Sequence, residues 1–169
     1  MTPRRRRGTV LLLAAVAVVV LVGDDRPLPF LWLPLVTGLG YLLAAAAGGR
    51  DGDLWGPGLV VTGFGLGAVL TVDGPVGGDL FAPVVLTTVG AGAVLALLLP
   101  RVGIPVDAMS VAAAVLLSGV FFLLSEPRVL DLRSPLLYGV LLASWGAWEM
   151  RPERTTTESS AARREPITP

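Results

Sequence analysis

The 169-residue chain contains no cysteine, histidine, lysine, asparagine or glutamine. Without cysteine it has no disulfide, thiolate nucleophile or thiolate metal ligand. Without histidine, a Ser-His-Asp or Cys-His arrangement lacks its base and a zinc site lacks its imidazole ligands. The chain also has no G-x-x-x-x-G-K-[ST] loop to hold a nucleotide phosphate. These absences predict a protein that is not an enzyme and has no catalytic, cofactor-binding or metal-binding residues.

Charge is scarce as well, because only 15% of the residues are charged and the formal net charge is zero. A surface that binds nucleic acid needs a net basic face, so the balance argues against a nucleic-acid partner. All 13 basic residues are arginine, and Ala, Gly, Pro and Val are abundant. This composition is typical of a GC-rich coding sequence and favours a bacterial source.

Hydrophobic residues make up 53% of the chain, and the mean hydropathy is +0.74. They are gathered in long runs, and a bilayer core of about 30 Å needs about 20 apolar helical residues. The sequence therefore predicts an all-α polytopic membrane protein with short loops and six transmembrane helices. The expected helices span residues 9–23, 29–47, 54–72, 80–99, 104–124 and 135–149.

Polar segments flank this transmembrane domain, which covers residues 9–150. Residues 1–8 form a basic N-terminus, and residues 151–169 have too little apolar surface to offset the entropy of ordering them. We expect the latter to be a disordered tail. The first apolar run is short and follows basic residues, as in a signal peptide. However, Leu21 and Gly23 do not form a small-residue cleavage pattern, so an uncleaved helix is favoured.

The arginines predict the orientation in the membrane. With six crossings and a cytoplasmic N-terminus, ten arginines fall on the cytoplasmic side, and only Arg26, Arg128 and Arg133 fall on the other. Cytoplasmic loops of membrane proteins carry an excess of basic residues. The sequence therefore places both termini in the cytoplasm and the protein in the cell membrane.

A recurring pattern marks the expected starts of three helices: Trp32-Leu33-Pro34, Trp55-Gly56-Pro57 and Phe81-Ala82-Pro83. Proline in the first turn of a helix costs no hydrogen bond, so Pro57, Pro83, Pro105 and Pro135 predict helix starts. Pro34 lies deeper in its segment and either begins or bends the helix. The pattern fits a duplicated helix unit, but convergence on residues that suit any bilayer helix start is the favoured interpretation.

Small residues recur at four-residue spacing in the third, fifth and sixth expected helices. Helices in lipid pack by close backbone approach along such faces. We expect these faces to make contacts inside the bundle, and self-association through one of them is the alternative. The residues are Gly63 and Gly67; Ser110, Ala114 and Ser118; and Gly139, Ala143 and Ala147.

No charged residue lies at the middle of an expected helix. Asp107 comes nearest, in the expected first turn of the fifth helix, where the partial positive charge of the helix end favours a capping role over ion coupling. Asp51 and Asp53 are interpreted as a polar turn rather than a cation site. Helical Ser and Thr usually bond back to a carbonyl one turn earlier, so we expect a structural role for the hydroxyl residues within the expected transmembrane helices. They are Thr37, Tyr41, Thr62, Thr87, Thr88, Ser110, Ser118 and Ser144.

The sequence names no substrate, and the functional prediction is reached by elimination. It favours a non-enzymatic accessory or interaction component of the bacterial cytoplasmic membrane. Its expected partners are the lipid bilayer and either another membrane protein or a second copy bound through the small-residue faces. The alternative is a small transporter or channel that acts as an oligomer, with the hydroxyl residues and the glycine-rich third and fourth helices lining a path.

Overall fold

The computed structural model describes residues 2–23, 25–49, 53–124 and 135–150. Within these ranges the chain is all-helical, as predicted, with six α-helices and no strand. Short 3-10 helices precede α2 and α4 and follow α4. The predicted disordered tail and the loop residue Asp51 lie outside the described residues. The α-helices are α1 (Pro3–Leu21), α2 (Leu33–Gly48), α3 (Trp55–Val72), α4 (Phe81–Leu98), α5 (Ala108–Leu124) and α6 (Pro135–Glu149).

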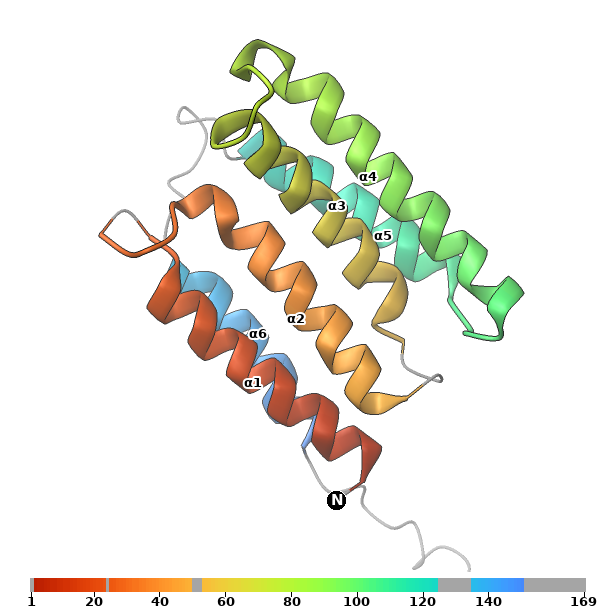
Figure 1. The fold of residues 1–169 in the computed structure, drawn as a ribbon. Helices are drawn as coiled ribbons and strands as arrows, with labels where there is room; N and C mark the ends of the chain where they lie inside the picture. Colours follow the sequence, from red (N-terminus) through yellow and green to blue (C-terminus); the bar gives the residue numbers. More distant parts are fainter. Residues whose placement is uncertain (1, 24, 50–52, 125–134, 151–169) are drawn as a thin grey trace, which may run out of the picture.

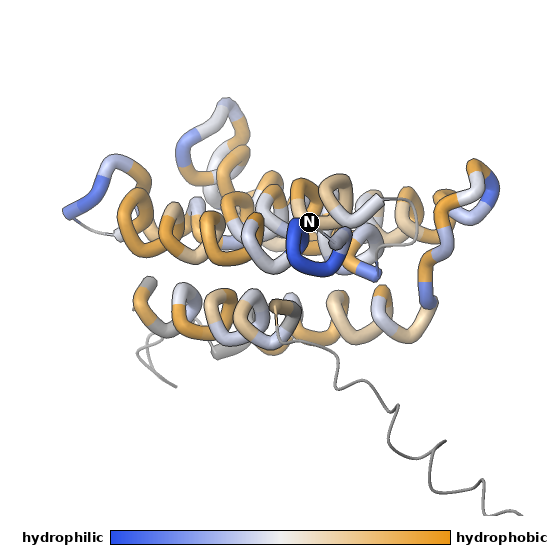
Figure 2. Tube along the Cα trace, turned by 90° about the horizontal axis from the view of Figure 1, so that it is seen from below, coloured by the Kyte–Doolittle hydropathy of each residue, from blue (hydrophilic) through white to orange (hydrophobic). Residues whose placement is uncertain are grey.

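Four helices form one layer and the other two lie on one face of it (Figure 1). In the first layer α1, α2, α3 and α4 are neighbours in chain order, and each runs antiparallel to the one before. In the second layer α6 packs on α1, and α5 packs on α3 and α4. Figure 2 shows this second layer beneath the first. Because two helices cover a layer of four, part of the face made by α2 and α3 lies between α5 and α6.

Three helix starts differ from the predicted ones. Helix α2 begins at Leu33 rather than at residue 29, because the 3-10 helix Phe30–Trp32 precedes it. Helix α1 begins at Pro3 rather than at residue 9, because Thr2 Oγ1 accepts the Arg5 amide at 3.4 Å and a proline fills the first turn. The arginine run therefore forms the first turns of α1 instead of an extended terminus. Helix α5 begins at Ala108 rather than at residue 104. Pro34 is the second residue of α2, so it begins this helix and does not bend it.

Helix α3 lies inside the first layer and approaches both of its neighbours through glycine. Gly65 lies against the backbone of Leu35 in α2, and Gly63 lies against the carbonyl oxygen of Thr88 in α4. A Cβ atom at either glycine would collide with backbone atoms of the neighbour. This close approach is the way in which helices pack in lipid. The predicted packing role of the Gly63 face is confirmed.

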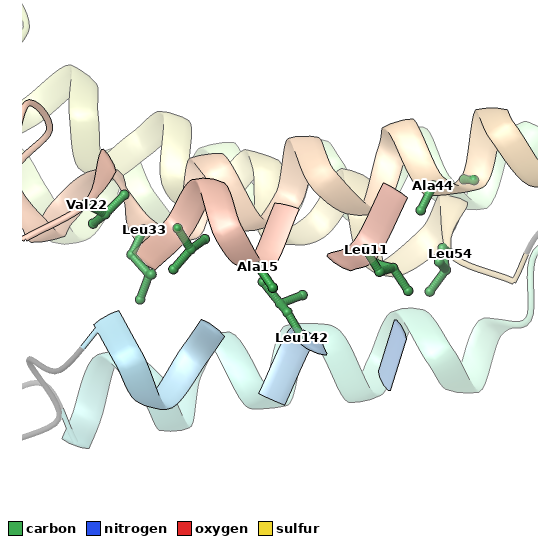
Figure 3. Close-up of a cluster of buried hydrophobic side chains, with 9 residues drawn as sticks. Leu11, Ala15, Val22, Leu33, Ala44, Leu54 and Leu142 are labelled. Atoms are coloured by element: carbon green, nitrogen blue, oxygen red, sulfur yellow. The ribbon is translucent and has the colours of Figure 1, made fainter. Parts of the chain in front are cut away.

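Two clusters of buried side chains hold the layers together. The first joins α1, α2 and α6, where Leu11, Leu33 and Leu142 are at most 3% exposed (Figure 3). The second joins α3, α4 and α5 around Val60 and Phe64. Each cluster thus fixes one helix of the second layer onto the first.

The outer surface of the bundle is also apolar. Leu13, Leu86 and Leu116 expose 64%, 72% and 67% of their surface on three different helices. Water-soluble monomers rarely expose contiguous apolar patches of more than about 300–600 Å². The described charged residues gather at helix ends and in loops (Figure 2).

Three described helical spans are long and apolar enough to cross a membrane: Phe30–Gly48, Trp55–Val72 and Gly78–Val102. The α-helices within these spans are α2, α3 and α4, which are adjacent in the first layer. Together with the apolar outer surface, they give the chain the architecture of a membrane-associated helical protein.

Candidate functional site

Asp107 caps the N-terminus of α5. Its Oδ1 accepts the amide of Met109 at 3.2 Å, and its Oδ2 accepts the amide of Ser110 at 3.0 Å. The Ser110 hydroxyl in turn donates to the Asp107 carbonyl oxygen at 2.7 Å. Both carboxylate oxygens are therefore occupied by the first turn of the helix, which confirms the predicted capping role. The residue precedes α5 instead of lying inside its first turn.

Four of the eight predicted hydroxyl residues, Ser110 among them, donate to a carbonyl oxygen about one turn earlier. Thr87 donates to the Pro83 carbonyl at 2.7 Å, Thr88 to that of Val84 at 3.0 Å, and Ser118 to that of Ala114 at 2.8 Å. The predicted bonding back to the preceding turn is confirmed for these side chains. The Thr62 Oγ1 is buried and has no hydrogen-bond partner among the described residues. The predicted bond to the preceding turn is also absent for Thr37, Tyr41 and Ser144 among the described residues.

The small-residue faces are used for packing inside the bundle. On α5, Ala114 and Ser118 are buried. On α6, Gly139 lies against Val19 of α1, and Gly146 lies 3.0 Å, measured from an added Cβ, from the carbonyl oxygen of Gly8.

Ala147, which the four-residue spacing assigned to the contact face of α6, is exposed instead. A helix has 3.6 residues per turn, so a strict four-residue repeat drifts off the contact line and residue 146 takes the place of 147. The contact face of α6 therefore runs through Gly139, Leu142 and Gly146.

The glycine faces of α3 and α4 are closed against each other. Gly67 lies against Val85 and Thr88, and Gly92 lies against Leu59 and Val60. An added Cβ at Gly92 would lie 3.2 Å from the Val60 Cα atom. The backbones of α3 and α4 are therefore in close contact at these glycines, whereas a Cβ atom at Gly90 of α4 would meet nothing within 4 Å.

An open groove with a volume of about 370 Å³ lies between α5 and α6. Its floor is made by α2 and α3. Helix α2 contributes Leu33 and Pro34, and the α3 side contributes Phe64 and Leu54, the residue before α3. Leu54 and Phe64 are ten residues apart, so the groove extends about 15 Å at a rise of 1.5 Å per residue. Pockets that bind small molecules have volumes of about 300–1,000 Å³.

The walls of this groove are mostly apolar, with a few polar groups. Helix α5 contributes Ala113 and Leu117, and α6 contributes Tyr138 and Trp145. None of the described residues that line the groove is charged. No group of three or more His, Cys, Asp or Glu residues that could hold a metal ion occurs in the described part of the chain.

Aromatic rings connect the floor to the α6 wall. The Tyr41 and Trp145 rings are tilted by 51° with their centroids 6.5 Å apart, and the Phe30 and Tyr138 rings have a centroid distance of 6.0 Å. The two ring pairs bridge α6 to α2 and to the 3-10 helix before it. They stiffen one side of the groove, because such pairs prefer a limited set of geometries.

Sequence reasoning did not find this groove. Tyr41, Ser110 and Ser118 were recognised as polar residues inside helices, but nothing linked them to Trp145. The only local signal is that Thr37 and Tyr41 are four residues apart and so share one face of α2. The groove depends on where α5 and α6 pack, which is a tertiary property.

Comparison with known proteins identifies no relative from which a function for the groove could be inferred. No protein-family model, curated protein or solved structure matches the chain. The function is therefore argued from the groove and from the distribution of charge.

Proposed function

We propose that this chain is a multi-pass protein of the bacterial cytoplasmic membrane that acts as a non-enzymatic accessory component, by binding a partner molecule within the bilayer. The observation that carries the proposal is the groove between α5 and α6, which is open and apolar and has no charged side chain among its described residues. General acid–base catalysis needs a proton-transferring side chain beside the substrate. Among the polar groups in the groove, only the hydroxyls of Tyr41 and Tyr138 belong to a side-chain type used for proton transfer, and no carboxylate or second titratable type accompanies them. We therefore assign the polar groups a binding role.

The charge distribution supports an orientation with both termini in the cytoplasm. The start of α1 and the end of α4 lie at the same end of the antiparallel bundle, and they carry Arg4 to Arg7 and Arg101. At the opposite end, the described residues include only Arg26 as a basic group. This asymmetry follows the positive-inside rule.

Reporter fusions test this orientation. A fluorescent protein that matures only in the cytoplasm is expected to be bright at either terminus. Alkaline phosphatase, which is active only outside the cytoplasm, is expected to be active when inserted after Arg26. A phosphatase that is active at either terminus would overturn the proposed orientation.

A pair of neighbouring substitutions on α5 tests binding in the groove. Ala113 lines the groove, whereas Ala112 is exposed on α5 and does not line it. Ala113→Trp is expected to fill the groove, and Ala112→Trp places the same side chain outside it. Both variants carry the same added bulk on the same helix, which controls for folding and expression.

The measurement is native mass spectrometry of protein extracted from its own membranes in mild detergent. The wild-type chain and the Ala112→Trp variant are expected to retain a defined bound species that the Ala113→Trp variant loses. A wild-type chain without any retained species would overturn the proposal, and so would retention of the species by Ala113→Trp. A membrane-protein partner or a second copy would be recognised by its mass in the same spectra.

A further inference from the structure

Three polar groups in the groove have no hydrogen-bond partner among the described residues. They are the Thr37 hydroxyl, the Tyr41 hydroxyl and the Trp145 indole N–H. Thr37 and Tyr41 lie one turn apart on the same face of α2, and the Trp145 ring packs beside the Tyr41 ring at 6.5 Å. The groove is open, and Trp145 is 49% exposed, so within a membrane these groups would face hydrocarbon. A polar group that faces an apolar medium without a partner costs free energy, so a ligand that pairs with these groups gains affinity.

The depth of these three polar groups in the membrane restricts the chemical class of the ligand. The membrane-crossing span Phe30–Gly48 has its midpoint at residue 39, and Thr37 and Tyr41 are each two residues from it. At 1.5 Å per residue they lie about 3 Å from the middle of the span. The hydrocarbon core is about 30 Å thick, so the ester carbonyls of bilayer lipids lie about 15 Å from its centre. The lipid ester carbonyls therefore lie about 12 Å closer to the membrane surface than the polar groups of the groove, which is too far for a hydrogen bond.

We propose that the groove binds a carbonyl-bearing molecule that dissolves entirely in the hydrocarbon core, of the class of the isoprenoid quinones. This inference rests on the proposed function and names its ligand. The ring would lie beside Tyr41 and Trp145, whose O–H and N–H donate to its carbonyl oxygens. The apolar body would occupy the rest of the groove, against side chains such as Phe64 and Leu117.

Two probes with the same alkyl tail separate this chemistry from simple apolar filling. One is a benzoquinone with a decyl chain, and the other is decylbenzene, which lacks the carbonyls. Each is titrated into the purified, delipidated protein, and binding is measured by native mass spectrometry. The quinone is expected to bind the wild-type chain about tenfold or more tightly than decylbenzene, because a neutral hydrogen bond contributes about two- to tenfold and two donors are available.

Substitutions test whether the preference for the quinone over decylbenzene depends on the Tyr41 hydroxyl and on the groove. Tyr41→Phe removes one hydroxyl and keeps the ring, so the quinone is expected to bind about three- to tenfold more weakly while decylbenzene binding is unchanged. Ala113→Trp is expected to abolish the binding of both probes. Ala112→Trp is expected to bind both as the wild type does.

The outcomes distinguish the two proposals. Equal binding of both probes to the wild-type chain, lost in Ala113→Trp, would overturn the carbonyl ligand and leave binding in the groove intact. A quinone preference that survives both Tyr41→Phe and Trp145→Phe would also overturn the assigned donors. If neither probe binds while the native species of the membrane extract is still retained, the ligand class is wrong and the proposed function stands.

Discussion

Gly65 and Gly90 give a paired test of whether glycine brings α3 close to its neighbour. Both residues lie inside long helices, α3 and α4, so replacement by alanine changes helix propensity in the same way at each. A Cβ atom at Gly65 would meet the backbone of Leu35 and lie 2.7 Å from its Cβ, whereas a Cβ atom at Gly90 would meet nothing within 4 Å. The two substitutions therefore differ mainly in packing.

The expected magnitudes have opposite signs. Alanine in a helix interior is more favourable than glycine by about 1 kcal/mol, so Gly90→Ala is expected to raise the free energy of unfolding by about that amount. At Gly65 the same gain is opposed by an overpacking cost of about 3 kcal/mol, at the upper end of the usual range because backbone atoms of α2 must move. Gly65→Ala is therefore expected to lower the free energy of unfolding by about 2 kcal/mol.

Thermal unfolding in a single detergent, followed by circular dichroism, measures the difference. A change of 1 kcal/mol shifts Tm by about 2–4 °C for a chain of this size, so Gly65→Ala is expected to melt about 4–8 °C below the wild type. Gly90→Ala is expected to melt at or above the wild-type Tm. If Gly65→Ala were as stable as Gly90→Ala, the close contact between α2 and α3 would be refuted.

Two further predictions use the same thermal assay. Asp107→Ala is expected to lower the stability by about 1 kcal/mol through loss of the α5 cap, while Asp107→Asn retains most of it because asparagine also caps helices; equal losses in the two variants would contradict capping. Thr62→Val is expected to raise the stability by about 1 kcal/mol, because the buried hydroxyl without a partner is replaced by a methyl group of similar size; a lower Tm than that of the wild type would indicate that this hydroxyl has a partner.

Features that depend on one segment at a time were predictable from the sequence. Apolar runs of about 20 residues predicted the helices, and the proline and aromatic residues at their starts placed α2, α3 and α4 within a few residues. The Asp107 cap followed from an acid near the start of an expected helix, where the partial positive charge of the helix end favours an acid. Gly63 was assigned to a helix contact because helices in lipid need small residues where they cross.

Features that depend on two segments were not predictable in the same way. Trp32 Nε1 donates to Asp73 Oδ2 at 2.7 Å across 41 residues of sequence, and no local pattern indicates this pair. The start of α1 was placed too late because a run of four arginines looks like a solvated terminus, although arginine is a good helix former. The groove was not predicted because no sequence pattern in α5 or α6 indicates that these two helices pack apart from each other.

The groove follows from the way in which glycine is distributed over the bundle. Helix α3 uses Gly65 toward α2 and Gly63 toward α4, which leaves the face with Gly56 and Val60 for α5. Gly139 and Gly146 hold α6 tightly against α1, at the opposite edge of the layer.

Helix α6 cannot move toward α5 without giving up these close contacts with α1, because the contact energy of helices in lipid depends on backbone approach rather than on hydrophobic exclusion. The strip of α2 and α3 between the two helices is therefore left uncovered by the described chain. That strip carries Thr37 and Tyr41, the two hydroxyl residues nearest the middle of α2. The close contacts of α6 with α1 and of α5 with α3 thus leave a groove between α5 and α6. In this groove, near the middle of the span, a polar group without a partner is most costly, and we therefore place the ligand there.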